Sequence, residues 1–305
     1  MSSTVTTSKT VPSQGTGNQA IPQVLPRLPE KPIVTIQPRD AWTALNLREL
    51  WHYRELLYFL IWRDVKVRYK QTVFGVTWVV MQPLLSTIVF TILLGKLARV
   101  PSNGVPYPLL VFAGLLPWTF FSIALGTAST SLVANAHLIT KIYFPRMLIP
   151  TAVVAARLLD CFISFIVLIG LMIFYHVPFA PRMFFLPLLM ILAALLTVAV
   201  AIWTAAMNVK YRDVGVALPF LIQLLMFASP VVYPSSLIYE HTNSLGRFIF
   251  NLNPLVGIID NLRALLLGLP FNWIAFGMSF AVTSLLLFVA AFEFRRLERG
   301  FADVV

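Results

Sequence analysis

The sequence predicts an all-α polytopic membrane protein with six transmembrane helices. Its 305 residues are 58% hydrophobic and only 11% charged, and its mean hydropathy is +0.82, a combination that excludes a soluble domain. The chain also contains six charge-free stretches of at least 21 residues, each long enough to cross about 30 Å of hydrocarbon. We expect spans near residues 73–97, 107–132, 149–175, 183–207, 214–234 and 271–294.

The basic residues predict the orientation of these spans. The formal net charge is +11, but the lysines and arginines lie beside the spans, where they serve topology rather than nucleic-acid binding. In the six-span arrangement, seventeen of the 23 lysines and arginines lie on one side and five on the other. The richer side is the cytoplasmic side by the positive-inside rule, so both termini are predicted to be cytoplasmic.

The first 43 residues are predicted to form a disordered cytoplasmic tail. They are rich in Ser, Thr, Gln and Pro, and they contain no apolar core of the kind that a signal peptide has. At the other end, residues 297–305 are predicted to be a short cytoplasmic tail.

Residues 44–70 are predicted to form an amphipathic interfacial helix followed by a basic run. Asn46 and Glu49 have the spacing of a helix-capping box. At about 100° per residue, apolar and aromatic side chains gather on one broad face, which favours a helix lying flat in the headgroup layer. This face consists of Leu50, Trp51, Tyr53, Leu57, Tyr58, Ile61 and Trp62. The basic run 63–70 directly precedes the first span.

The connection between the fifth and sixth spans contains a helical pattern that is too short to be a span. Residues 255–268 follow an Asn-Pro helix start and number about 14. A helix of this length is predicted to be a re-entrant or interfacial segment on the outer side.

The motifs of enzymes and nucleotide-binding proteins are missing. Gly95 and Lys96 form the only Gly-Lys pair, but Phe90 stands where a phosphate-binding loop requires glycine. The four histidines have no metal-ligand spacing, and Cys161 is the single cysteine. We therefore expect a non-enzyme that carries no catalytic residue, metal site or cofactor of its own.

Two pairs of charged residues are candidate sites. Arg157 and Asp160 stand at i and i+3 near the inner end of the third span, where charges are costly and mark either a helix–helix tie or a functional group. Asp260 and Arg263 repeat this spacing in the outer segment. There the alternatives are a structural tie and contact with a polar or anionic substrate at a channel exit.

Aromatic residues near the span ends have two interpretations. They are typical of the belt that anchors a protein at the membrane interface. Alternatively, some of them line a conduit in which flat rings contact sugar rings. The candidate channel residues of this kind are Phe74, Trp78, Trp118 and Tyr233.

Two short inner loops combine polar, basic and aromatic side chains. Each is either an ordinary positive-inside loop or a docking site for another protein. The candidates in the first loop are Asn135, His137, Ile139, Lys141 and Tyr143. Those in the second loop are Lys210, Tyr211, Arg212 and Asp213.

Several of these segments together resemble the membrane subunit of type-2 ABC exporters. The segments are 62–72, Phe144-Pro145-Arg146, 208–213, 229–234, 253–255 with Arg263, and 298–305. The resemblance covers residues 42–305 and is greatest for the branch that exports lipid-linked O-antigen, capsular polysaccharide or teichoic acid.

This resemblance implies a homodimer in the bacterial inner membrane, with residues 71–296 as the transmembrane domain. It implies two copies of a separate ATPase chain that bind ATP and magnesium, a lipid-linked glycan substrate, and a polymer path between the two subunits. Residues 134–147 are similar to the coupling helix that docks on the ATPase, and residues 208–214 to a second contact. Two alternatives stay open: an exporter of teichoic acid, drugs or small lipids, and a membrane enzyme that acts on lipid-linked sugars.

Overall fold

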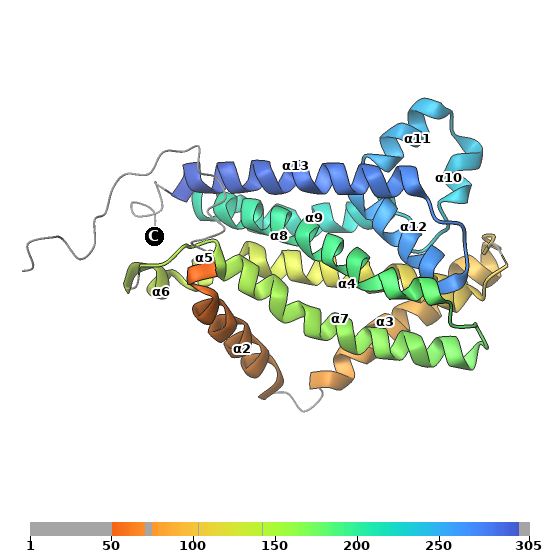
Figure 1. Ribbon diagram of the computed structural model, residues 1–305, viewed down its shortest axis with the longest axis horizontal. Helices are drawn as coiled ribbons and strands as arrows, with labels where there is room; N and C mark the ends of the chain where they lie inside the picture. The colour runs from red at the N-terminus through yellow and green to blue at the C-terminus, as the bar shows by residue number, and fades with distance from the viewer. Residues whose placement is uncertain (1–50, 71–74, 103, 142, 299–305) are drawn as a thin grey trace, which may run out of the picture. The chain divides into compact units, whose positions relative to one another are not determined.

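The computed structural model describes residues 51–70, 75–102, 104–141 and 143–298 (Figure 1). Within these ranges the chain forms helices and no strand, so the predicted all-α class is confirmed. The predictions for residues 1–43, Leu50 and Phe74 lie outside the described residues.

In the part of the chain that the structure describes, five helices are long and apolar enough to cross a membrane, which agrees with a multi-pass membrane protein. Their bounds lie within a few residues of the predicted spans. They are α3 (Gly75–Phe90) continued by the π-helix η1 (Thr91–Leu97), α4 (Tyr107–Ser129), α7 (Leu148–Phe174), η2 (Pro181–Phe185) continued by α8 (Leu186–Lys210), and α13 (Trp273–Glu298).

The remaining predicted span, 214–234, is a shorter helix. α9 (Asp213–Ala228) has 16 residues, or about 24 Å at about 1.5 Å per residue. It ends before Pro230, because proline disfavours a helical conformation in the preceding residue and has no N–H to donate. The chain then reaches the opposite end of the helices, where α10 (Ser236–His241), α11 (Ser244–Asn251) and α12 (Pro254–Leu267) lie (Figure 1).

The centre of the fold is α4, which is buried along most of its length. It packs against α7, α8 and α12. Small residues allow the close approach, and Gly114 is the clearest case. A Cβ at this position would lie 2.1 Å from the carbonyl oxygen of Val231, so a larger residue would collide with the neighbouring backbone.

A second apolar cluster joins the ends of the helices that the sequence predicts to be cytoplasmic, which we call the inner ends. It unites α2 (Arg54–Lys70), α6 (Ala136–Lys141), α7, α8 and α13. Leu60 of α2 and Phe294 of α13 are almost completely buried within it. We call this group of residues the inner cluster, and it holds both α2 and the first inner loop against the spans.

Candidate functional site

The first inner loop has one face packed on its own subunit and one face exposed. It contains α5 (Ser131–Ala134) and α6. Ile139 is buried in the inner cluster, together with Phe144. The sequence interpretation had Ile139 as a docking residue, but its side chain is covered by its own subunit. A short amphipathic helix such as α6 buries its apolar side against the spans. In contrast, Tyr143 is 81% exposed.

The predicted docking residues that remain exposed form two groups at the inner end. His137 and Lys141 lie with Tyr143 on the first loop. Lys210, Tyr211, Arg212 and Asp213 are exposed on the second loop, where the Lys210 Nζ lies 5.0 Å from the centre of the Tyr211 ring. Asn135 is half-buried and donates its side-chain N–H to the carbonyl of Ser131.

Asn208 opens the segment 208–214 that the resemblance likened to a second ATPase contact, but the sequence interpretation assigned it no role of its own. It lies in the last turn of α8 and is only 6% exposed. Its Nδ2 donates to the carbonyl oxygen of Ser129 at 3.1 Å, and its Oδ1 accepts from the backbone N–H of Gly215 at 3.0 Å. The available sequence signal was an amide side chain at the end of an apolar span, directly before the exposed second loop.

The apolar residues at 51–62, in α2 and just before it, divide between two faces rather than forming the single face that was predicted. Tyr53, Leu57 and Ile61 are half-buried and pack on the inner cluster. Trp51, Tyr58 and Trp62 point away from the subunit and are exposed. α2 packs against α7 at an inclined angle (Figure 1), so one apolar face packs on the subunit and the aromatic face is left exposed. The basic run 63–70 continues the same helix to Lys70.

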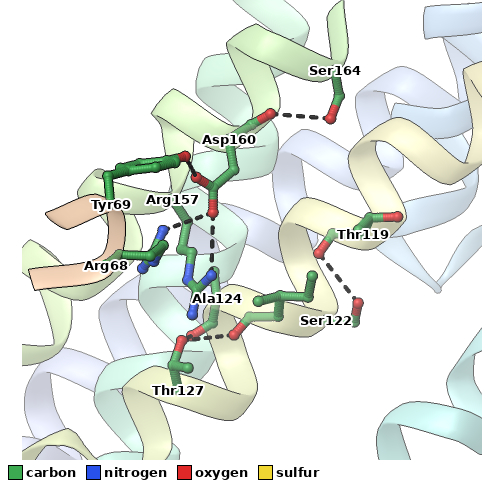
Figure 2. Close-up of polar contacts among 10 residues, drawn as sticks. Arg68, Tyr69, Thr119, Ser122, Ala124, Thr127, Arg157, Asp160 and Ser164 are labelled. Carbon is green, nitrogen blue, oxygen red and sulfur yellow. Dashed lines mark hydrogen bonds and ion pairs between the residues drawn. The ribbon is translucent and has the colours of Figure 1, made fainter. Parts of the chain in front are cut away.

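A cluster of charged residues fastens the end of α2 to α7 (Figure 2). Asp160 accepts hydrogen bonds from Arg68 at 2.7 Å, from Arg157 at 3.1 Å, and from the Tyr69 hydroxyl. Burial, and then the hydrogen bond to Asp160, raise the pKa of Tyr69 to about 12, so the phenol stays protonated and can donate. The Arg157–Asp160 pair therefore takes part in a helix–helix tie, one of the two roles that the sequence left open.

Replacing Asp160 with asparagine should loosen this tie. The side chains of Arg68 and Arg157 are each less than a quarter exposed, so the loss of the carboxylate should lower the free energy of unfolding by about 2–3 kcal/mol. Thermal unfolding in detergent measures this. Glu293→Gln is the matched control, because its i,i+3 pair with the exposed Arg296 contributes little. Equal unfolding temperatures for the two variants would contradict the prediction.

The two faces of α2 should respond differently to truncation. Leu60→Ala is expected to lower the free energy of unfolding by about 3 kcal/mol, because it empties a fully buried site. Tyr58→Ala, on the exposed face, should leave unfolding in detergent unchanged and should reduce the stabilisation gained on adding lipid. Unfolding temperatures with and without added lipid test both statements. The assignment of faces is wrong if Tyr58→Ala is the more damaging variant in detergent.

At the outer end, Arg263 is a structural tie. It is 2% exposed, and its guanidinium donates to the carbonyl oxygens of Leu110 at 3.0 Å, Tyr233 at 2.9 Å and Val231 at 2.6 Å. These bonds fasten the turn after α9 to the outer end of α4. The side chain thus has the structural role that the sequence had left open beside substrate contact.

The other candidate channel residues do not converge on one surface of the subunit. Trp118 is 5% exposed and lies in the core, whereas Trp78 is 61% exposed on α3. Tyr233 is half-buried, and its hydroxyl donates to the carbonyl of Phe227. Asp260 is partly buried on α12 and accepts a hydrogen bond from Ser235. Among these residues, Trp78 is the one that a single subunit presents openly.

Asp260 should make the stability of the outer segment depend on pH. Burial raises the pKa of Asp260 to about 6, against opposing effects of the Ser235 hydrogen bond and the Arg263 charge. Because the pKa of Asp260 is higher in the folded than in the unfolded chain, the folded state is favoured while this carboxyl is protonated. The contribution is fully present below about pH 4, and about 3 kcal/mol of stability is lost as the pH rises through 6. Asp260→Asn should therefore match the parent protein near pH 4 and unfold at a higher temperature at pH 7.5. A difference that does not vary with pH would refute this.

Comparisons with known proteins place these features in context. The model of the family described as "ABC-2 type transporter" matches residues 55–267. The chain is 31% identical to the O-antigen export system permease protein RfbA of Myxococcus xanthus, over 83% of this chain and 96% of that protein. It is 28% identical to each of two proteins of the same name from Klebsiella pneumoniae, over 82% of this chain and 95% of theirs.

Proposed function

The chain belongs to the ABC-2 type transporter family, and from this premise we propose that it is the membrane subunit of an ATP-driven exporter of O-antigen-like, lipid-linked polysaccharide. Two copies form the membrane part, and two copies of a separate ATPase chain bind ATP and magnesium beneath them. The substrate is moved from the cytoplasmic to the outer side of the bacterial inner membrane. The substrate class rests on the names that the relatives carry.

The two inner loops support an ATPase partner, because each exposes a tyrosine at the inner end of the subunit. The first loop is fixed to the spans by Ile139 and presents Tyr143 away from them. The second loop exposes Tyr211 between two basic residues. Loops held rigidly on one side and open on the other can receive force from a partner, and exposed tyrosines are frequent anchors of protein interfaces.

The observation that supports a second copy of the chain is the weak coverage of α3. Among the five long helices of the described residues, α3 with η1 is the one least buried in its own subunit, and Trp78 is exposed on it. We place the second subunit against this side, with the polymer path between the two copies. The aromatic face of α2 then lies in the headgroup layer at the cytoplasmic entrance.

Purification of the chain from the membranes of its host tests the proposal. An ATPase chain and a polyprenyl-linked glycan should accompany it, and liposomes that contain both chains should accumulate the glycan only with ATP. Conversion of lipid-linked sugars by this chain alone, without ATP, would instead favour a membrane enzyme. ATP-driven transport of small hydrophobic compounds and no glycan would favour an exporter of drugs or small lipids.

A further inference from the structure

The inner ends of three helices meet at one buried amide. The Asn208 side chain on α8 donates to the carbonyl of Ser129, the last residue of α4. It also accepts from the N–H of Gly215, in the first turn of α9. Ser129 lies 79 residues from Asn208 in the sequence, so the amide connects parts of the chain that are distant in sequence.

The bond to Ser129 reaches a carbonyl at the end of α4, and the Gly215 N–H is shared between the Asn208 Oδ1 at 3.0 Å and the carbonyl oxygen of Arg212 at 3.2 Å. The last carbonyls of an α-helix have no intrahelical partner. Because Asn208 is nearly buried, water does not readily replace it when it is lost. A Cβ at Gly215 would lie 2.9 Å from the Asn208 Oδ1, so a side chain at this position would displace the amide.

α4 and α9 are also connected at their outer ends. Arg263 binds the carbonyl of Leu110 in α4 together with those of Val231 and Tyr233 in the turn that follows α9. α4 and α9 are therefore held together at the inner end by Asn208 and at the outer end by Arg263. Each of the two inner loops begins at one of the helix ends that Asn208 connects.

We propose that Asn208 is a positioning residue that makes α4 and α9 move as one rigid body during transport. A displacement of either inner loop then reaches both helices, and through them the outer turn at residues 229–233. Without the amide, the two loops move independently, and ATP hydrolysis is no longer converted efficiently into movement of the polymer. This inference rests on the proposed ATP-driven function.

Liposomes containing this chain and the ATPase chain that co-purifies with it allow a direct test. Asn208→Leu keeps the side-chain size and removes both bonds, so export per ATP hydrolysed should fall about tenfold, whereas assembly and hydrolysis persist. Asn208→Asp keeps the acceptor for Gly215 but loses the donor to Ser129, and it should show the same uncoupling.

Thr204→Val is the matched control. Thr204 is buried one turn earlier on α8, and its hydroxyl donates to the carbonyls of Val200 and Ala201 in its own helix. This variant should export as the parent protein does. Equal export per ATP for Asn208→Leu and Thr204→Val would overturn the inference. If the unaltered protein itself shows no ATP-dependent export, the proposed function fails instead.

A distance measurement keeps the test decisive if the Asn208 variants do not assemble. Thr130, at the end of α4, and Val216, on α9, are both exposed and accept spin labels in a Cys161→Ala background. Labelled chains are diluted with unlabelled ones so that distances within one chain dominate. With Asn208 intact, this distance should be the same without nucleotide and with ATP and vanadate. A distance that changes with nucleotide overturns the inference.

Discussion

Arg263→Met should destabilise the protein by roughly 3–6 kcal/mol, because it leaves three carbonyl oxygens without their donor. Two of the three bonds, to Leu110 and Val231, are fully buried. Methionine fills much of the same volume, so the loss reports hydrogen bonding rather than a cavity. The outer turn should separate from α4, and a large fall of the unfolding temperature in detergent would show this.

Arg247→Met is the control for this prediction. Arg247 lies in the same outer region but is exposed, and its Nε donates to the carbonyl of Thr242. Gly114→Ala should disturb the same guanidinium, because the added Cβ would lie 2.4 Å from the Arg263 Nη2. It should be damaging in the same region. Similar unfolding temperatures for Arg263→Met and Arg247→Met would show that the guanidinium does not hold the outer turn.

The helices were predictable because hydrocarbon permits few structures. An apolar stretch of about 20 residues must pair its backbone groups internally, so it becomes a helix whose ends follow the polar residues. The start of α4 at Tyr107 and the bounds of α12, Pro254–Leu267, lie within one residue of the prediction. The outer end of α9 was placed too far, because the apolar run continues past Pro230 although the helix does not.

The direction in which apolar side chains point was not predictable in the same way. Lipid and protein interior are both apolar, so hydrophobicity does not distinguish them. Trp118 and Trp78 look alike in the sequence, yet one lies in the core and the other is exposed. The partners of Arg263 were not predictable either, because they are backbone carbonyls and every residue has one. The carbonyl of Leu110 is 153 residues away in the sequence.

Tyr143→Asp should separate ATP hydrolysis from export without unfolding the protein. Tyr143 is 81% exposed, so a carboxylate there faces water in the isolated chain and should not change its unfolding temperature. In the assembled exporter the same carboxylate replaces an aromatic anchor, at a cost of about 2 kcal/mol or more in affinity for the ATPase. Binding to the ATPase should weaken about 30-fold, with less export per ATP hydrolysed.

Ile139→Asp and Tyr143→Phe serve as controls for Tyr143→Asp. Ile139 is buried in the inner cluster, so a carboxylate there should lower the unfolding temperature, a different failure from weak docking. Tyr143→Phe keeps the ring and should retain most of the affinity. A loop can drive transport only if its contact with the ATPase differs between nucleotide states, so affinity is measured with and without ATP. If Tyr143→Asp binds and exports as Tyr143→Phe does in both states, the exposed face of the first loop is not the coupling surface, because the side chain that it presents most openly contributes nothing to docking.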